Sequence, residues 1–258
     1  MKKILIVSGI LSIAVTSCLK DLFCLEGNGI TETQRRNTSL FNQIENTTGI
    51  DILYKKADTV SLTVRSETNL LSHIQTEVSG GNLKIKTDPG NTCFNSSERP
   101  LITITSPGIE RVVLTGSGDF RAEAITGESF NIKVNGSGDA LVSGLKCDDL
   151  LVTINGSGDV ELPDSEVLNS DLSVSGSGDL NIKGSCDNSK MMVTGSGDIV
   201  SDKFLVRTAN ETISGSGNIH TNVVISLKAV ISGSGNIYLT GNPLIDQTIT
   251  GSGKIIKN

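Results

Sequence analysis

The sequence contains few aromatic residues and histidines, and it has no tryptophan. Only 3% of its 258 residues are aromatic, and two are histidines. Aromatic side chains supply large buried areas and stack on sugars and bases, so their scarcity argues against a bulky globular core and against a sugar-stacking or base-stacking groove. Two histidines leave little for a His-rich metal site or a histidine-based catalytic centre. The formal net charge of −6 provides no concentrated basic surface, so we expect no nucleic-acid partner.

Long hydrophobic runs are also missing, except near the N-terminus. Lys2 and Lys3 precede a mostly apolar stretch, residues 4–15, which is too short to span a bilayer. This order is typical of an export signal, which we place at residues 1–17. Cys18 directly follows a Val-Thr-Ser sequence, which resembles the lipobox of bacterial lipoproteins. The resemblance implies that Cys18 is the first mature residue and carries a lipid that anchors it to a membrane; the alternative is an ordinary secretory signal.

The rest of the chain divides into three parts by its patterning. Residues 18–39 are polar with little periodicity, and we predict a tether between the lipid and the fold. Residues 40–114 alternate apolar and polar residues without a 20-residue period. This pattern predicts a β-rich segment that caps the open end of the following structure. Residues 115–258 carry a repeat and form the main body.

Gly-Ser-Gly recurs eight times in the repeat region, at spacings of 18 to 20 residues. The first glycines are Gly116, Gly136, Gly156, Gly176, Gly195, Gly215, Gly233 and Gly251. An aliphatic residue stands two positions before each motif, and an apolar residue stands four positions after its first glycine. Because side chains alternate along a strand, we expect the apolar residues and glycines to face inward and the serine and its polar neighbours outward. Each motif is then one extended segment that bends at its glycines.

This period and composition predict an all-β fold. Paired glycines disfavour a helix, and a propeller blade needs about 40 residues. Twenty residues suit one coil of a parallel β-solenoid with two or three short strands. We therefore predict a right-handed solenoid of about eight coils. The two spacings of 18 predict a trimmed corner and no lost strand, and the terminal lysines discourage edge pairing.

An acidic column follows the glycine motif. The residues directly after the eight motifs are Asp119, Asp139, Asp159, Asp179, Asp198, Asn218, Asn236 and Lys254. Calcium prefers several oxygen ligands, so a calcium ladder is one interpretation. One acid per coil is few, however, and Asn and Lys occupy the same position. We favour hydrogen bonds to nearby backbone amides, and we predict no metal site and no cofactor.

The sequence offers little for catalysis, and we predict no catalytic residues. A serine nucleophile needs a base within reach, and the eight identical serines argue for a structural role. Of the two histidines, His73 and His220, we expect His220 to be a solvated outward side chain. A solenoid enzyme needs a cleft with acids, whereas this uniform outward stripe better suits a repetitive partner. The mixture of Thr, Asn and Ser makes an ice-binding array a remote option.

Four cysteines remain after the signal region. Cys147 and Cys186 each lie nine residues before a motif, two coils apart. Valines occupy this position in other coils: Val167, Val206 and Val224. Two coils are about 9.6 Å apart at sheet spacing, whereas bridged Cα atoms lie within about 7 Å. We therefore predict that these two cysteines are small buried hydrophobes without a mutual disulfide, and that any disulfide joins Cys24 to Cys93.

Three features in combination resemble a known bacterial family. The lipobox, the strand-rich lead ending at residues 107–114, and the Gly-Ser-Gly-Asp tandem resemble the putative auto-transporter adhesins with a head GIN domain, over residues 38–258. The resemblance implies an all-β, β-helical, envelope-associated protein, and it brings no catalytic residues.

From these observations we expect a lipid-anchored protein of a Gram-negative envelope, in the outer membrane, facing the periplasm or the exterior. Its expected role is adhesion or binding of a surface protein or glycan, not catalysis. Two alternatives stay open: an enzyme that processes surface glycans, and a structural, oligomer-forming envelope protein. A homo-oligomer is compatible with these expectations.

Overall fold

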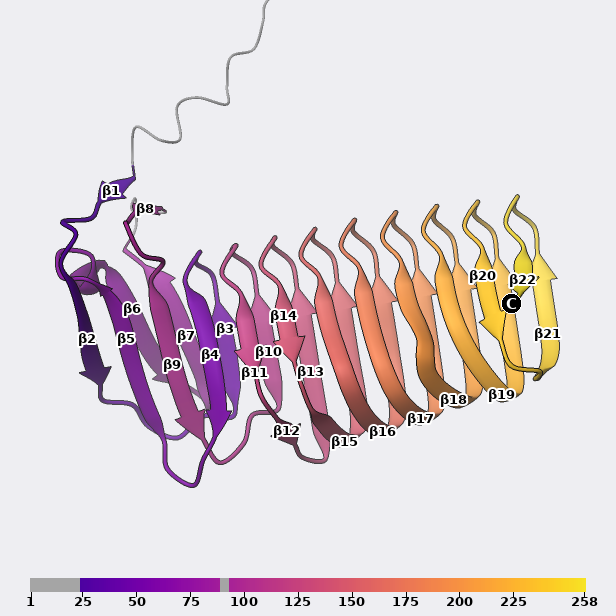
Figure 1. The fold of residues 1–258 in the computed structure, drawn as a ribbon, viewed down its shortest axis with the longest axis horizontal. Helices are drawn as coiled ribbons and strands as arrows, with labels where there is room; N and C mark the ends of the chain where they lie inside the picture. The colour runs from indigo at the N-terminus through magenta and orange to yellow at the C-terminus, as the bar shows by residue number, and fades with distance from the viewer. Residues whose placement is uncertain (1–23, 89–92) are drawn as a thin grey trace, which may run out of the picture.

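The computed structural model describes residues 24–88 and 93–258, and its strands stack along one axis into an all-β solenoid (Figure 1). The expected signal over residues 1–17 and the expected lipid site at Cys18 lie outside the described residues. The strands are β1 (Leu25–Glu26), β2 (Thr31–Arg36), β3 (Gln43–Asn46), β4 (Asp51–Lys56), β5 (Ser61–Glu67), β6 (Ile74–Ser79), β7 (Asn82–Thr87), β8 (Phe94–Asn95), β9 (Leu101–Ser106), β10 (Arg111–Leu114), β11 (Phe120–Ala122), β12 (Ile125–Thr126), β13 (Ser129–Val134), β14 (Ala140–Val142), β15 (Leu145–Ile154), β16 (Val160–Val174), β17 (Leu180–Val193), β18 (Ile199–Ile213), β19 (Ile219–Ile231), β20 (Ile237–Thr240), β21 (Leu244–Ile249) and β22 (Ile255–Lys257). The 3-10 helix η2 spans Leu71–His73. No helix among the described residues is long and apolar enough to cross a membrane.

Each coil of the repeat region stacks in parallel on the coil before it. Strand β16 pairs with β17 along three runs, residues 160–162, 165–167 and 169–174, so each coil has three sides. Burial alternates along these runs, as in Val174, which is fully buried, and Ser173, which is partly exposed. The core is therefore a narrow column of mainly aliphatic side chains, and the predicted parallel β-solenoid with an apolar inside is confirmed.

The Gly-Ser-Gly motif forms a corner between two strands of a coil, whereas the sequence pattern suggested one extended segment. The corners line up as the row of tips in Figure 1. In this row the Ser157 N–H donates to the carbonyl of Gly136 one coil earlier, at 3.0 Å. A Cβ on Gly156 would overlap that same carbonyl oxygen. The close approach of stacked backbones therefore requires glycine at these corners.

The column of corners begins earlier than the sequence pattern indicated. Strands β3 and β4 pair in parallel with β10 and β11, and residues 48–50 form the corner between β3 and β4. The Gly118 N–H donates to the Thr48 carbonyl at 3.0 Å, so this Thr-Gly-Ile corner supports the first Gly-Ser-Gly corner. On their other side, β3 and β4 pair in parallel with β7 and β9. The solenoid therefore includes β3 and β4, which lie before the predicted boundary at residue 115.

Antiparallel strands close the N-terminal end of the solenoid. Strand β5 pairs antiparallel with β9 and β2, and β6 pairs antiparallel with β7. The structure corrects the tether prediction, because β1 and β2 lie inside residues 18–39. Strand β2 is almost wholly exposed and has no apolar pattern. Its backbone hydrogen bonds to β5 hold it in the sheet, and such bonds leave no trace in the composition.

The cysteine and register predictions can be compared directly with the pairing. Cys147 pairs with Val167, and Val167 pairs with Cys186, so the two cysteines share one inward position two coils apart. Both are buried and free, as predicted. Val206 pairs with Val223 and not with the predicted Val224, because the register between β18 and β19 shifts at the shortened corner.

Candidate binding groove and the acidic ladder

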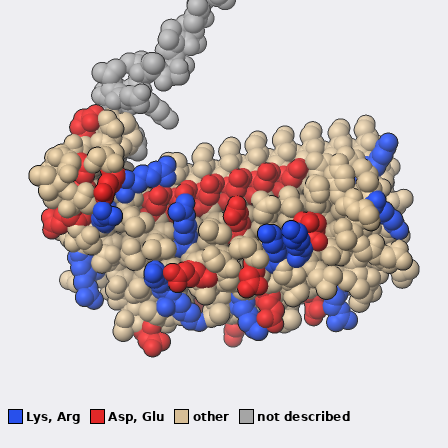
Figure 2. Space-filling view, in the orientation of Figure 1, with Lys and Arg blue, Asp and Glu red and all other residues tan. Residues whose placement is uncertain are grey.

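The acidic column is a hydrogen-bonded ladder. The N–H of Asp139 donates to the Asp119 carboxylate at 3.0 Å, and the N–H of Asp159 donates to Asp139 at 2.8 Å. The same bond continues through every coil to Lys254, and it begins with Asp51, which accepts from Asp119. Figure 2 shows the resulting acidic row beneath the corner tips. The backbone-bonding interpretation is confirmed, since each coil supplies an acceptor for the next.

The ladder does not gather acids into a chelating cluster. Neighbouring carboxylates belong to different coils, and each accepts a backbone N–H. Among residues 24–88 and 93–258, no group of three or more His, Cys, Asp or Glu side chains is arranged to hold a metal ion. The observed interactions of the ladder are therefore its hydrogen bonds between successive coils.

A groove of about 580 Å³ crosses five successive coils on another side of the solenoid. Its lining comes from residues 129–131, 149–151, 169–171, 188–190, 208 and 210. At about 4.8 Å per coil, four steps give a length of roughly 19 Å along the axis. The groove thus runs parallel to the stacking direction over about four coil steps.

One wall of the groove is a ladder of side-chain amides. Asn169 donates to the Asp149 carboxylate at 2.9 Å, and Asn188 donates to the Asn169 carbonyl at 3.1 Å. These side chains are exposed, and Thr208 continues the column. Each amide donates one N–H to its neighbour, and its other N–H and one lone pair remain available to a ligand. The two amides therefore present neutral donor and acceptor groups at two coil steps, and Asp149 adds a carboxylate at the step before them.

The floor of the groove is built from two buried serines. Ser170 donates to Ser189 at 2.7 Å, and the two residues stack one coil apart. The same inward position holds Phe130 and Leu150 in the earlier coils, so the floor changes from large apolar to small polar residues along its length. The smaller side chains contribute to the hollow at this corner of the coil.

The opposite wall combines an ion pair with an apolar side chain. Lys190 bonds to Asp171 at 2.9 Å across neighbouring coils. Leu151 precedes Asp171 in the same column and is 39% exposed. The groove contains two carboxylates and one lysine, so it has little net charge and no basic cluster.

The two histidines lie outside this groove. His220 faces outward, as expected, but it is half-buried because its ring stacks on Tyr238 with 4.5 Å between centroids. His73 bonds to Asp88 at 3.1 Å in the cap.

One buried acid was not anticipated from the sequence. Glu211 lies in the core column between Met191 and Ala229 and is 1% exposed. Within the described part of the chain, no hydrogen bond of normal geometry reaches its carboxylate oxygens. Burial raises the pKa of Glu211 to about 8, and the Thr221 hydroxyl nearby offsets part of this effect.

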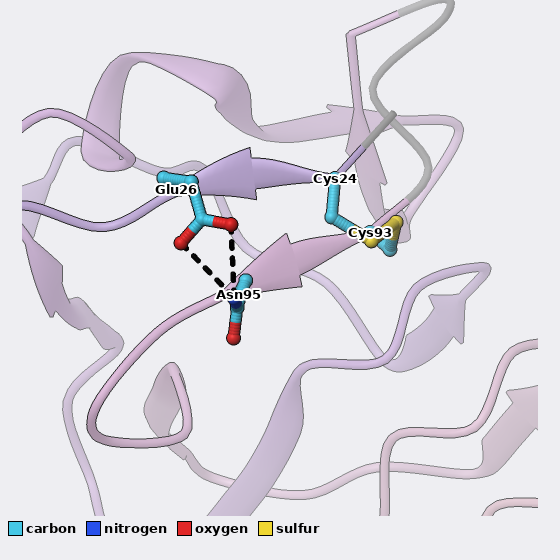
Figure 3. Close-up of a disulfide and its surroundings, with 4 residues drawn as sticks. All are labelled: Cys24, Glu26, Cys93 and Asn95. Atoms are coloured by element: carbon cyan, nitrogen blue, oxygen red, sulfur yellow. Dashed lines mark hydrogen bonds between the residues drawn. A yellow bond between two sulfur atoms is a disulfide. The ribbon is translucent and has the colours of Figure 1, made fainter. Parts of the chain in front are cut away.

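The N-terminal cap is tied down by a disulfide and a buried carboxylate. Cys24 and Cys93 form a disulfide at the start of the β1–β8 pair, as predicted (Figure 3). Beside it, Glu67 accepts hydrogen bonds from the Gly29 N–H at 2.6 Å and from the N–H and hydroxyl of Ser97. The Gly29 bond, followed by the Ser97 bonds, lowers the pKa of Glu67. Three separate segments are thereby fixed at the end of the solenoid that is nearest to Cys18 in sequence.

The groove was missed by sequence reasoning, although a signal for one wall existed. Polar residues recur seven positions before the glycine motif: Ser129, Asp149, Asn169, Asn188, Thr208 and Ser226. Their position in the inward and outward alternation predicts a column of outward side chains. The hollow beside this column depends on how the backbone of each coil turns, which the alternation does not specify. A repeat of polar residues alone does not reveal such a turn.

The stacked coils, the glycine corners and the side groove define a capped parallel β-solenoid with an elongated surface site. The sequence matches the family model for the putative auto-transporter adhesin, head GIN domain, over residues 40–243, and the chain belongs to this family. No curated protein matches the sequence.

Solved structures share the whole architecture. A putative lipid binding protein from Parabacteroides distasonis is 30% identical, with a TM-score of 0.86 over 91% of this chain and 99% of its own. A putative adhesin from Parabacteroides merdae has the same TM-score at 21% identity, over 91% of this chain and 98% of its own. A putative adhesin from Bacteroides fragilis has a TM-score of 0.70 at 22% identity, over 91% and 100%. At these identities, the two adhesin structures show a shared fold and nothing further.

Proposed function

We propose that this protein is a lipid-anchored adhesin of a Gram-negative cell envelope that binds a surface ligand in its side groove. The observation that carries the proposal is the groove itself, a 580 Å³ hollow that runs across five coils. Continuous strand pairing on both sides of these coils makes the groove wall rigid. Binding therefore carries only a small entropic cost for ordering the protein. The adhesin family supports an envelope location.

The disulfide suggests how the molecule is oriented on the membrane. Five residues separate Cys18 from Cys24, and the six steps between their Cα atoms can span at most about 22 Å. A lipid on Cys18 would therefore hold the capped end near the outer membrane, and the solenoid and its groove would project away from it.

Two other functions have less support from the groove. The relative from P. distasonis carries a lipid-binding name. Apolar atoms form the larger part of the groove surface, but most of the lining residues carry amide, hydroxyl or charged groups, which an acyl chain would leave without partners. Hydrolysis of a glycan needs two carboxylates free to act as acid and base. Here Asp149 is bonded to Asn169, and Asp171 is bonded to Lys190.

Anchoring and exposure can be tested on intact cells. We expect the wild-type chain to fractionate with the outer membrane, to carry lipid by mass spectrometry, and to be cleaved by protease added outside. Cys18→Ala should release it into a soluble fraction. A chain that carries no lipid, together with a variant that stays in the membrane, would refute the anchor. Protection of the wild type from external protease would place it on the periplasmic face and refute a surface adhesin.

A further inference from the structure

We propose that the groove binds an uncharged, polyhydroxylated chain, that is, a neutral glycan, laid along the solenoid axis. This inference rests on the proposed binding function and names its ligand class. The amide column, the serine floor and the Asp171–Lys190 pair together select this chemistry.

The spacing of donors and acceptors favours an extended ligand with repeated hydroxyls. Asp149, Asn169 and Asn188 follow one another at one coil step along the wall. Each Asn can donate to one hydroxyl and accept from another, because only one of its N–H groups is used within the ladder. Exposed Leu151 adds an apolar surface on the facing wall, against which the C–H face of a sugar ring can pack.

The charge of the groove disfavours an ionic ligand. Lys190 is the single cation of the lining, and Asp171 already pairs with it at 2.9 Å. Asp149 leaves one uncompensated negative charge. A phosphate or an acidic sugar would meet like charge without a free basic partner, which costs binding energy. An amine-bearing chain would find one exposed carboxylate, too little for a dominant ionic contact.

A peptide fits the groove less well than a glycan does. Extended peptides usually bind by adding a strand to a free sheet edge. The strands along the groove are β13, β15, β16, β17 and β18, and each of them is paired on both sides. Their backbone groups are therefore used within the solenoid, and a peptide backbone would find only side-chain partners.

Affinity electrophoresis of the Cys18→Ala chain tests the proposal. The probes are neutral polysaccharides (mannan, xylan, dextran and β-glucan), acidic ones (hyaluronan and polygalacturonate), and a glycan array that contains both kinds. We expect retardation by at least one neutral glycan, and at least a tenfold weaker response from acidic ones. The double variant Asn169→Ala/Asn188→Ala should lose at least tenfold in affinity for the same probe.

A second amide pair in the molecule supplies the matched control. Asn155 donates to Asn135 at 2.9 Å at the corner tips, outside the groove. Asn135→Ala/Asn155→Ala removes the same chemistry and should leave binding unchanged. Equal loss in both double variants, or binding of acidic glycans only, would overturn the neutral-glycan assignment while the adhesin proposal stands. If no glycan binds but cells that display the chain still adhere, the neutral-glycan assignment is likewise overturned and the adhesin proposal stands. Absence of both glycan binding and adhesion would refute the proposed function itself.

Discussion

Glu211 should make the solenoid less stable as the pH rises, and replacing it should remove this dependence. Its carboxyl is fully buried among core side chains, and its pKa in the folded chain is about 8, against an ordinary value of 4.5. A raised carboxyl pKa means that the folded state holds its proton more tightly than the unfolded state. Well below pH 4.5 both states are protonated, and the pH-dependent cost of the group disappears.

The cost grows between the two pKa values. Each pH unit in this window lowers the free energy of unfolding by about 1.4 kcal/mol, because the unfolded chain has released a proton that the folded chain keeps. The full shift corresponds to about 5 kcal/mol, and the part between pH 5 and pH 8 to about 4 kcal/mol. Above pH 8 the difference becomes constant, since Glu211 then ionises in both states.

Glu211→Gln keeps the shape of the side chain and cannot ionise. We expect wild type and variant to unfold alike in denaturant at pH 4.5, and the variant to be more stable by about 4 kcal/mol at pH 8. For a chain of this size that difference corresponds to roughly 10 °C in Tm. Glu161→Gln, on the exposed side of β16, is the control and should follow the wild type. If the stability curves of wild type and Glu211→Gln run parallel from pH 5 to pH 8, the buried proton is refuted.

Other substitutions test the stacking, the corners and the cap. Val174→Asp puts a charge in the closed core and should lower the free energy of unfolding by several kcal/mol or unfold the chain. Ser177→Ala should change the free energy of unfolding by less than about 0.5 kcal/mol. Equal melting temperatures of the two variants would refute the assignment of Val174 to the inside and Ser177 to the outside. Gly176→Ala forces a Cβ onto the carbonyl of the preceding corner and should destabilise by about 1–3 kcal/mol in denaturant unfolding, and unchanged stability would show that the corners can separate. Reduction of the Cys24–Cys93 disulfide, which closes a separation of 69 residues, should cost up to about 4 kcal/mol and expose the cap to limited proteolysis; an unaltered digestion pattern would show that Glu67 and the strands suffice.

The repeat region was predictable because each coil of the structure corresponds to one repeat of the sequence. Eight copies at nearly one spacing fix the coil length, and strand parity then sets which residues face the core. The free thiols of Cys147 and Cys186 followed from the same register. Glu211 lies two residues before an inward isoleucine, Ile213, and the register that placed the cysteines also places its carboxylate inside. Its raised pKa depends on the absence of a partner, which only the packed structure reveals.

The capped end was harder to predict because its interactions join distant residues. At the first corner, Thr48 and Ile50 occupy the positions that the two motif glycines take in later coils. Residues 57–110 then interrupt the period. Strand β2 is held by main-chain bonds to β5, and its polar side chains gave no hydrophobic signal. The groove likewise arises from a turn of the coil wall and from the small floor residues Ser170 and Ser189, and no short motif encodes that shape.

The hydrogen-bonded ladder gives the solenoid a growth direction. Each Asp or Asn accepts from the coil that follows, so a duplicated unit such as residues 156–175 would find an acceptor beneath it and offer one above it. Such a duplication would lengthen the rod by about 4.8 Å and disturb neither end. Lys254 breaks this rule, because its side chain has no acceptor, and Lys257 occupies a position that is apolar in the preceding coil. Changes in the length of the solenoid are therefore expected as whole-coil insertions within the stack, and not as additions after the last lysine.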